Sequence, residues 1–447
     1  MNTSRPLADP ALPPQLTIDP IRHPLNATVR MPGSKSLTNR ALLIAALTNG
    51  MTKISNALFS DDSKYFANAL KTLGFHIQLD EEDLEMTVTG MGGNVPVEKA
   101  ALFIGNAGTA ARFLTAFLKL GHGQYIIDGD ARMRERPIGD LVEALNQLVD
   151  EYKPVITDPW TLVPDYSYIC LPLMINARGL YGGKTKIAGE TSSQFISALL
   201  MVAPYARSPV KIELTTELNS KPYVDMTIAV MKDFGVGVER NGYSSFTIHP
   251  TNYFPIANYQ IESDASAASY FFAAPAICGG TVRVENISRD SIQGDIAFLD
   301  ILQQMGCEVT NGINYIELTG ADSLQGVNVD MRDIPDTAQT LAVIAPFASS
   351  PTRIRGIASA RVKETDRVSA TCTELKRLGV QVDEHDDGMT IHPCDTFNRA
   401  KIETYNDHRM AMAFSLIGLR CDGVTIENPA CVSKTFPNYF NVLDSLR

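Results

Sequence analysis

Residues 366–384 read DRVSATCTELKRLGVQVDE, in which about three amphipathic helical turns are followed by a glycine and a β-like segment. An aspartate in this place can cap the free N–H groups of a helix start. The glycine permits the left-handed backbone with which many helices end. The stretch therefore predicts a helix followed by a strand.

The pattern is repeated along the chain. Copies begin at Asp62, Asp225 and Asp295, a weaker copy without the glycine begins at Asp140, and a truncated copy, FPNYFNVLDSLR, ends the chain at Arg447. Successive complete copies begin 70 to 85 residues apart, whereas solenoid repeats span roughly 20 to 50 residues. Each repeat is therefore expected to hold more than one helix and one strand.

A second helix is predicted upstream of each copy. These runs are apolar almost all round, which is typical of buried helices. They are NRALLIAALTNG (39–50), GTAARFLTAFLKLG (108–121), SSQFISALLMVAPYA (192–206), ASAASYFFAAPAICGG (265–280), TAQTLAVIAPFAS (337–349) and DHRMAMAFSLIGLR (407–420). The chain is thus predicted to form six α/β units, three on each side of a joint near residues 250–262.

Composition narrows the class of protein. The 447 residues are 45% hydrophobic and 20% charged, which is typical of a globular protein of two or more domains. No apolar run approaches about 20 residues, so no membrane segment is predicted. Residues 1–14, MNTSRPLADPALPP, show neither a signal sequence nor a transit peptide and are predicted to be a flexible tail. Seven cysteines without a C-x-x-C pair indicate reduced thiols in a cytoplasmic protein.

Charge and histidine spacing exclude further classes of site. A net charge of −11 argues against nucleic-acid binding, which calls for clustered surplus cations. Any anionic ligand must therefore meet a local positive pocket. The seven histidines lack zinc-ligand spacing, so no metal site is predicted.

The predicted buried helices all begin with small, hydroxyl or charged residues, and we call these segments the polar helix starts. They are PGSKS (32–36), GNAGTA (105–110), GETSSQ (189–194), ESDASA (262–267), IPDTAQ (334–339) and YNDHRMA (405–411). Helix N-termini offer free N–H donors and a partial positive charge, which suit phosphate and carboxylate. The polar segments also carry Lys35, Arg40, Arg132, Arg136, Lys363, Arg367, Arg409 and Lys434. Repetition in six units predicts that these segments line one shared cleft between the two halves.

Each segment has a simpler interpretation when it is taken alone. PGSKS and SSQ are good turn or capping sequences, GNAGTA suits close helix packing, and RVKETDR (361–367) is typical of a solvated helix start. His408 is more often structural than catalytic. Residues 178–185, RGLYGGKT, nearly match a P-loop, but Arg178 stands where the first glycine is required. Only the recurrence at equivalent places favours a common site.

Nine motifs resemble the 5-enolpyruvylshikimate-3-phosphate synthase family of enolpyruvyl transferases. They occur in order over roughly residues 16–447 and read MPGSKSLTNRALLIAAL, GNAGTAARFLTA, RMRERPIGDL, SSQFISALLM, SKPYVDMT, IPDTAQT, RVKETDR, YNDHRMAM and KTFPNYF. The resemblance implies a two-domain α/β fold, an inside-out α/β barrel in which each domain has three βαβαββ units and a cleft lies between the domains. It implies one domain of residues 34–262 and another of residues 15–33 plus 263–447, with closure on the substrates.

The resemblance also implies a reaction, in which the enolpyruvyl group of phosphoenolpyruvate moves to the 5-hydroxyl of shikimate 3-phosphate and phosphate leaves. This is a step of the shikimate pathway to chorismate and the aromatic amino acids. Neither a cofactor nor a metal is implied, glyphosate is the implied inhibitor, and the protein is expected to be a cytoplasmic monomer that binds no nucleic acid and no membrane.

Residue roles follow from the matching motifs. Shikimate 3-phosphate is expected to bind Lys35, Ser36, Arg40, Ser192, Ser193, Gln194, Ser220, Tyr223, Asp336, Ser359 and Lys363. Phosphoenolpyruvate is expected to bind Lys35, Gly108, Arg132, Gln194, Arg367, Arg409 and Lys434. Lys35, Asp336, Lys363 and Glu364 are the catalytic candidates. Asp336 resembles the base for the hydroxyl and Glu364 the acid for the methylene carbon, although the assignment of each proton transfer stays open.

The chain departs from the family pattern in three places. Ser359 stands where many members have asparagine, and Phe113 replaces a frequent proline. The segment ITDPWTLVPDYSYICLPLMINARG (156–179), which holds the only tryptophan, is unusual for the family. Gly108, rather than alanine, predicts a pocket that is open to glyphosate.

Two alternatives belong beside this interpretation. The related transferase that acts on UDP-N-acetylglucosamine has a characteristic cysteine before an Arg-Pro pair, whereas residues 128–137 here read DGDARMRERP. A non-catalytic binder of phosphorylated metabolites is expected to have lost Lys35, Asp336, Glu364 or Lys434, and all four are present.

Overall fold

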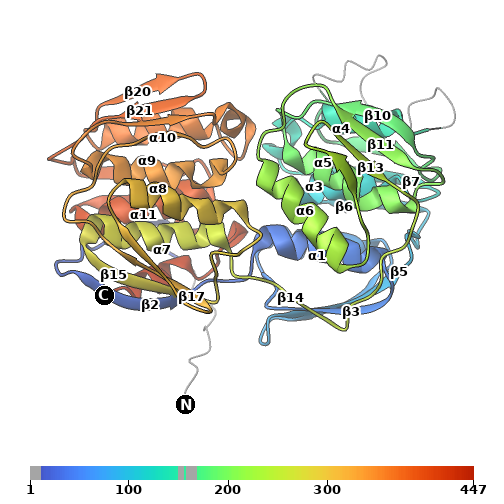
Figure 1. Cartoon of the computed structure of the whole chain (residues 1–447), viewed down its shortest axis with the longest axis horizontal. Coiled ribbons are helices and arrows are strands. Elements are labelled where there is room, and N and C mark those ends of the chain that lie inside the picture. Colours follow the sequence, from blue (N-terminus) through green and yellow to red (C-terminus); the bar gives the residue numbers. More distant parts are fainter. Residues whose placement is uncertain (1–11, 150–155, 158–168) are drawn as a thin grey trace. The chain divides into compact units, whose positions relative to one another are not determined.

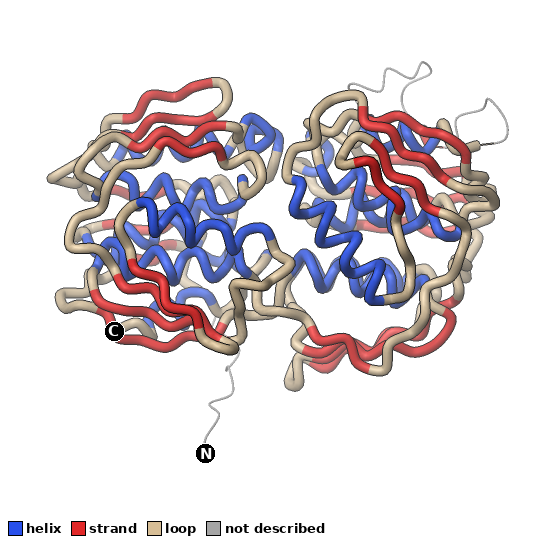
Figure 2. The backbone as a smooth tube through the Cα atoms, viewed as in Figure 1, coloured by secondary structure: helices blue, strands red, loops and turns tan. Residues whose placement is uncertain are grey.

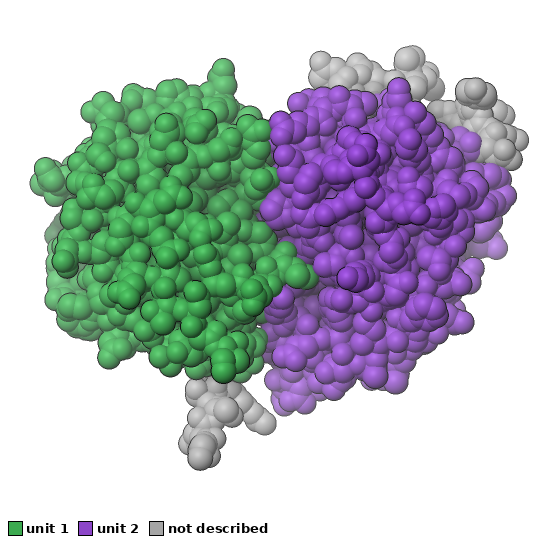
Figure 3. All heavy atoms as spheres, viewed as in Figure 1, with its two compact units in different colours: residues 1–32, 263–447 green, residues 33–262 purple. Residues whose placement is uncertain are grey.

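The computed structural model describes residues 12–149, 156–157 and 169–447. The chain divides into two compact units, coloured separately in Figure 3. Unit 2 comprises residues 33–262, and unit 1 comprises residues up to 32 together with residues 263–447. Gly33, expected with the C-terminal half, therefore belongs to unit 2.

Buried and amphipathic helices alternate along the chain, as the repeat predicts. The buried ones are α1 (Lys35–Leu47), α3 (Gly108–Leu118), α5 (Ser193–Val202), α7 (Ala265–Cys278), α9 (Ala338–Ile344) and α11 (His408–Arg420). The others are α2 (Asp61–Thr72), α4 (Gly139–Asn146), α6 (Lys221–Asp233), α8 (Phe298–Gln304), α10 (Arg367–Arg377) and α12 (Tyr439–Asp444). Every side chain of α3, α9 and α11 is buried apart from Arg420.

Each repeat also has a small sheet. In each sheet one pair of neighbouring strands is parallel, and the remaining pairs are antiparallel. In unit 2 the sheets have the orders β6-β7-β9-β8, β10-β11-β13-β12 and β14-β3-β5-β4. Their strands are β3 (Asn49–Ser55), β4 (His76–Asp80), β5 (Glu85–Met91), β6 (Lys99–Phe103), β7 (Gln124–Asp128), β8 (Ile156–Thr157), β9 (Leu173–Asn176), β10 (Gly183–Ile187), β11 (Val210–Leu214), β12 (Glu239–Asn241), β13 (Ser245–Ile248) and β14 (Asn258–Gln260).

In unit 1 the orders are β16-β17-β15-β2, β18-β19-β21-β20 and β1-β23-β22. The strands are β1 (Gln15–Thr17), β2 (Leu25–Arg30), β15 (Gly280–Glu285), β16 (Glu308–Asn311), β17 (Tyr315–Thr319), β18 (Asn328–Asp330), β19 (Thr352–Arg355), β20 (Val382–His385), β21 (Gly388–Ile391), β22 (Ala400–Ile402) and β23 (Val424–Glu427). In the last sheet β1 pairs antiparallel with β23. The sheet of the truncated sixth repeat therefore includes a strand from the start of the chain.

The two crossings between the units exchange the first strands of two repeats. β2 precedes α1 in the sequence, yet it pairs parallel with β15 of unit 1. β14 precedes α7, yet it pairs parallel with β3 of unit 2. The polar helix starts PGSKS and ESDASA therefore lie at the crossings, and the βαβαββ order is completed in each unit by a strand that is distant in sequence.

Within each unit the helices are central and the sheets lie outside them (Figures 1 and 2). In unit 1, α7, α9 and α11 contact one another, and their side chains join one hydrophobic core. In unit 2, α3 contacts both α1 and α5. Across the described part of the chain, no helix is long and apolar enough to cross a bilayer.

The predicted capping is correct in only one of the repeat copies. The Asp366 side chain accepts from Ser369 N and caps α10, whereas Asp62 and Asp140 lie inside the first turns of their helices. Asp225 lies in the second turn of α6 and pairs instead with Arg240. The helix exits are confirmed, because Gly74, Gly235, Gly306 and Gly379 have φ of 91°, 87°, 104° and 88°.

The tail predicted over residues 1–14 is wrong at its inner end. Pro14 O accepts a hydrogen bond from Asn428 N at 2.9 Å, and Leu12 packs against the core of unit 1. Residues 1–11 and residues 158–168 of the unusual segment 156–179, including its tryptophan, lie outside the described residues.

Candidate functional site

The polar helix starts of unit 2 hold cationic and hydroxyl groups. Ser34 caps α1, and Lys35 is the first residue of that helix. Lys35 Nζ lies 3.5 Å from Asp62 Oδ2 at the start of α2, and both side chains are largely buried. Ser36 is half-buried on the same turn.

Arg40 is a buried cation that is held by neutral oxygens. Its Nε donates to Thr227 Oγ1 at 2.7 Å, and its Nη2 donates to Ser197 Oγ and Tyr223 O at 3.3 and 3.0 Å. Nη1 donates to Ser36 O at 3.0 Å. Burial lowers the pKa of Arg40 to about 10. An arginine without a carboxylate partner in these contacts suits an anionic ligand.

Two further parts of unit 2 support this arrangement. Phe113, which stands where a proline is frequent in the family, places its ring 5.5 Å below the Arg40 guanidinium. Ser220 adopts a left-handed backbone at φ 57° before α6, and its carbonyl accepts from Tyr223 N at 3.1 Å. The turn thereby presents the Tyr223 carbonyl to Arg40.

The α3 and α5 starts are joined directly. Gln194 Nε2 donates to Thr109 Oγ1 at 3.3 Å, and Ser192 accepts from Gln194 N at 3.3 Å as the cap of α5. Ser193 is buried beside them. The structure thus brings together the hydroxyl and amide groups that were expected around the substrates.

Arg136 lies at the α3 start beside Gly108, whereas the sequence analysis assigned Arg132 to the phosphoenolpyruvate pocket together with Gly108. A Cβ added to Gly108 would lie 2.7 Å from Arg136 Nη2, so the guanidinium rests against the glycine. Arg136 is buried, and its Nη1 donates to Asn106 Oδ1 at 3.0 Å. Arg132 instead pairs with Glu135 at 2.8 Å and is more exposed. Both arginines were recognised as cations of the polar segments, but the sequence does not show which side chain turns toward the helix start.

In unit 1 a single carboxylate gathers three cations. Asp336 Oδ1 accepts from Lys363 Nζ at 2.7 Å and from Arg367 Nη1 at 3.1 Å. Asp336 Oδ2 accepts from Arg409 Nη2 at 2.9 Å. Burial alone would raise the pKa of Asp336, but Arg409, Lys363 and Arg367 together hold that pKa well below its usual range.

Arg367 connects this carboxylate to two others. Its Nη2 donates to Glu364 Oε2 at 2.8 Å, and its Nε donates to Asp407 Oδ2 at 2.7 Å. Only 3% of the Arg367 side chain is exposed. Burial alone would lower the pKa of Arg367, but Asp407, Glu364 and Asp336 outweigh burial and raise that pKa. Lys434 Nζ lies 3.9 Å from Glu364 Oε1.

The remaining candidates of unit 1 lie around this cluster. Ser359 is half-buried in the 3₁₀ turn Ala358–Val362, directly before Lys363. Burial lowers the pKa of Lys363, and the Asp336 carboxylate opposes that shift. His408 is buried, and its Nδ1 lies 3.4 Å from Asp407 Oδ1. Two acidic candidates, Asp336 and Glu364, and two basic ones, Arg367 and Arg409, are therefore connected by ion pairs within unit 1.

Asp295 is a buried carboxyl that the sequence analysis interpreted as a helix cap. It lies in the 3₁₀ turn Gly294–Ala297, where the Ser266 hydroxyl at the α7 start donates to Asp295 Oδ2. Burial, with the negative charge of Asp336, raises the pKa of Asp295 to about 6. The sequence pattern did not indicate this buried role of Asp295, because an aspartate that recurs at helix starts is usually a cap.

Asp295→Asn is expected to gain stability relative to the native chain as pH rises from 4 to 8. A carboxyl whose folded pKa is raised stabilises the fold below its unfolded pKa of about 4, and that stabilisation is lost as pH rises through about 6. Between pH 4 and pH 8 the variant should therefore gain up to about 3 kcal/mol in unfolding free energy relative to the native chain. Urea unfolding at several pH values measures this.

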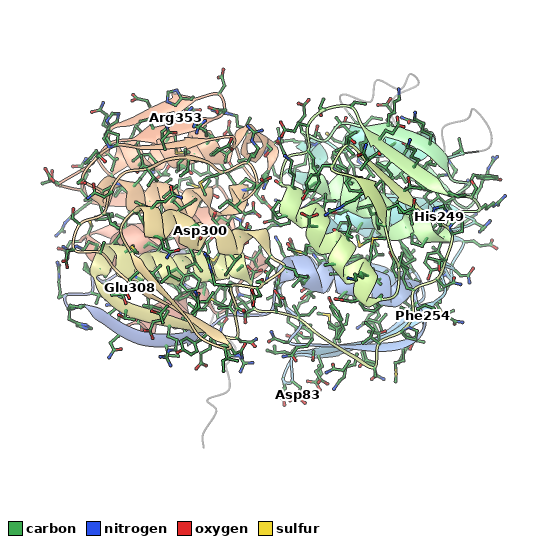
Figure 4. All side chains as sticks on the ribbon, viewed as in Figure 1. Asp83, His249, Phe254, Asp300, Glu308 and Arg353 are labelled. Carbon is green, nitrogen blue, oxygen red and sulfur yellow. The ribbon has the colours of Figure 1, made fainter. Side chains whose placement is uncertain are left out.

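The matched control is Asp300→Asn, at an exposed carboxylate on α8 that Figure 4 labels. The control should follow the native chain at every pH. A difference between Asp295→Asn and the native chain that stays constant from pH 4 to pH 8 would contradict the expectation.

Comparison with known proteins gives one family over nearly the whole chain. The family profile described as EPSP synthase (3-phosphoshikimate 1-carboxyvinyltransferase) matches residues 20–443. The 3-phosphoshikimate 1-carboxyvinyltransferase of Nostoc sp. PCC 7120 is 47% identical over 425 residues, which cover 95% of this chain and 97% of that protein. That of Sulfurovum sp. NBC37-1 is 48% identical over 433 residues, covering 96% and 99%.

Solved structures agree with this result. The EPSP synthase of Acinetobacter baumannii superposes with a TM-score of 0.79 at 25% identity, covering 96% of this chain and 97% of that one. The enolpyruvyl transferase NikO of Streptomyces tendae, at 17% identity and a TM-score of 0.76, shares the fold. The two-domain enolpyruvyl transferase fold is thus confirmed, and with nearly half of its residues identical to those of such relatives, this chain belongs to the EPSP synthase (3-phosphoshikimate 1-carboxyvinyltransferase) family.

Proposed function

We propose that this chain transfers the enolpyruvyl group of phosphoenolpyruvate to the 5-hydroxyl of shikimate 3-phosphate and releases phosphate. Within the family, the observation that supports this activity most directly is the carboxylate of Asp336, which holds Lys363, Arg367 and Arg409 together. Both substrates carry a phosphate and a carboxylate, and such ligands require several fixed cations. The activity is a step of the shikimate pathway toward aromatic amino acids.

Residues of both units are proposed to contribute to substrate binding. Phosphoenolpyruvate is assigned to Lys35, Gly108, Arg132, Gln194, Arg367, Arg409 and Lys434, and to these we add Arg136 because of its place beside Gly108. Shikimate 3-phosphate is assigned to Lys35, Ser36, Arg40, Ser192, Ser193, Gln194, Ser220, Tyr223, Asp336, Ser359 and Lys363. Arg40 donates four of its five N–H groups to protein oxygens, so ligand binding there uses the fifth or replaces one of these bonds.

Asp336 and Glu364 are proposed as the proton-transfer groups. One carboxylate removes the proton of the 5-hydroxyl as its oxygen bonds to C2 of phosphoenolpyruvate, and the other group delivers a proton to C3. The tetrahedral intermediate then returns the C3 proton to the group that delivered it, and phosphate leaves with the proton that the base took from the 5-hydroxyl. These steps restore the enol double bond and the protonation of the site. Lys363 and Lys35 are proposed to assist by neutralising charge.

The substrate-free cluster makes Asp336 a weak base, since three cations stabilise its ionised form. Anionic groups of the ligands compete for Lys363, Arg367 and Arg409. Substrate binding is therefore expected to relieve this stabilisation and to raise the basicity of Asp336 at the time when the 5-hydroxyl arrives.

Phosphate release from phosphoenolpyruvate tests the proposal, with shikimate 3-phosphate and UDP-N-acetylglucosamine as parallel acceptors and no added metal. Release with shikimate 3-phosphate alone supports it. Release with the sugar nucleotide alone would assign the chain to the related transferase, and release with neither would favour a non-catalytic binder. The proposal includes a cytoplasmic monomer without a cofactor, and sedimentation at assay concentration tests the oligomeric state.

Gly108→Ala is expected to raise the KM for phosphoenolpyruvate about 10-fold and to weaken inhibition by glyphosate, because the added methyl lies 2.7 Å from Arg136 Nη2 and must displace that guanidinium. The KM for shikimate 3-phosphate should change less than about twofold. Initial rates with each substrate varied in turn give both constants. Gly237→Ala is the control, since a Cβ there meets no atom within 4 Å. Unchanged constants in Gly108→Ala would show that Arg136 does not bind phosphoenolpyruvate.

A further inference from the structure

Two consecutive residues with side chains adopt the left-handed backbone directly before α11. Tyr405 and Asn406 both have φ of 53°. Such a conformation is unusual for a residue as large as tyrosine and persists only where surrounding contacts impose it. The residue that follows is Asp407, which caps α11 by accepting from Arg409 N at 2.9 Å and also accepts from Arg367. The turn therefore sets the start of the helix that carries Arg409.

Glu374 of α10 holds this turn from the interior of unit 1. Its side chain is fully buried, and its Oε1 accepts from the Tyr405 hydroxyl at 2.9 Å. Its Oε2 accepts from Glu403 N at 3.2 Å, while Glu403 Oε1 accepts from Tyr405 N at 3.1 Å. A buried carboxylate is thus committed to the backbone and side chain of the segment that ends in the left-handed turn.

A third left-handed residue connects the same turn to Lys434. Asn428 has φ of 47° and donates from Nδ2 to Asn406 Oδ1 at 3.1 Å. It directly precedes the 3₁₀ segment Pro429–Lys434, whose last residue lies 3.9 Å from Glu364. The Asn406–Asn428 contact therefore couples the start of α11 to the segment that ends at Lys434.

We propose that Glu374, Tyr405, Asn406 and Asn428 form a positioning network that fixes Arg409 and Lys434 in register for the phosphate and carboxylate of phosphoenolpyruvate. The inference rests on the proposed function, in which both cations bind this substrate. None of the four residues is assigned a contact with substrate. The network acts by holding Tyr405 in a left-handed conformation that is unfavourable for a bulky residue, and by joining that turn to the one at Asn428.

Tyr405→Phe and Asn428→Gly test the network with little disturbance to packing. The first removes one hydroxyl, and the second removes the donor while glycine keeps the left-handed backbone. Each should raise the KM for phosphoenolpyruvate about 5- to 10-fold and leave the KM for shikimate 3-phosphate within about twofold. Glu374→Ala should raise the KM for phosphoenolpyruvate more than either of these variants. Glu374→Gln keeps one acceptor oxygen and should lie between Glu374→Ala and the native chain.

Lys376→Ala is the matched control. Lys376 is exposed on the same helix as Glu374, two residues further along the chain. Its removal should leave both KM values unchanged. Amide hydrogen exchange of residues 405–411 and 429–434 provides a readout that does not depend on turnover, and exchange there should accelerate in Tyr405→Phe and Asn428→Gly.

The outcomes separate the two proposals. A selective rise in the KM for phosphoenolpyruvate with faster exchange in both segments supports the network. An active enzyme in which both KM values are unchanged, or rise equally as the melting temperature falls, would overturn it. If the native chain transfers no enolpyruvyl group, the proposed function fails, and the network is then judged by exchange alone, with unchanged exchange in both segments overturning it.

Discussion

Asp336→Asn is expected to lower kcat by about 1,000-fold, because asparagine cannot accept the proton of the 5-hydroxyl. The same change should leave the affinity for phosphoenolpyruvate intact or increase it. In the native chain the Asp336 carboxylate competes with anionic ligands for Lys363, Arg367 and Arg409, which bind it at 2.7, 3.1 and 2.9 Å. An amide competes less strongly for the same three cations. Rapid-quench turnover and calorimetric binding of phosphoenolpyruvate, both with shikimate 3-phosphate present, measure the two effects.

A loss of affinity without a loss of kcat in Asp336→Asn would give Asp336 a different role. If kcat is nearly unchanged while binding of phosphoenolpyruvate weakens, the carboxylate orients the cations and does not transfer the proton. Asp330→Asn is the matched control, since Asp330 pairs with Arg332 at 3.0 Å near the surface of the same unit. That variant should retain both kcat and affinity. The comparison separates loss of a base from general loss of an acidic residue.

The repeat in the sequence predicts both the buried and the amphipathic helices, because the buried face of a helix requires apolar residues at regular spacing. It cannot predict the exchange of β2 and β14, since both strands are short and their partners are distant in sequence. Strand pairing of this kind depends on where the chain crosses between units. Only the family resemblance, which places the N-terminal strand with the C-terminal half, anticipates part of it.

In the candidate site, too, sequence motifs identify some residues, whereas the contacts of others are known only from the structure. Asp336, Glu364, Arg367 and Arg409 are found from motifs and are connected in the structure. The segment RMRERP holds three arginines within five residues, and its 3₁₀ turn Met133–Glu135 decides which of them faces Gly108. Glu374 has no motif at all, because its role arises from a left-handed turn about 30 residues later, a contact that local patterns do not record.

Arg367→Met is expected to produce the largest loss of stability among these variants. The change leaves Asp407, whose side chain is fully buried, and Glu364 without the cation that binds them at 2.7 and 2.8 Å. Removing one partner of a buried ion pair costs about 3 to 5 kcal/mol. For a unit of this size the melting temperature should fall by roughly 10 °C at pH 7.5. Scanning calorimetry between pH 5 and pH 8 measures the loss.

The dependence of this loss on pH identifies its cause. Carboxylates that have lost their cation gain a proton more readily as pH falls, so the deficit of Arg367→Met should narrow toward pH 5. The depressed pKa of Asp336 does not change the stability of the native chain in this range, because the stabilisation that it gives is complete above the unfolded pKa of about 4 and is lost only at lower pH. Arg361→Met, which breaks the more exposed pairs with Asp366 and Glu384, is the control and should cost less than about 1 kcal/mol. Arg367→Met and Arg361→Met could instead show the same melting temperature at every pH. In that case Asp336, Glu364 and Asp407 do not depend on Arg367, and the cluster is held by Lys363, Arg409 and Lys434.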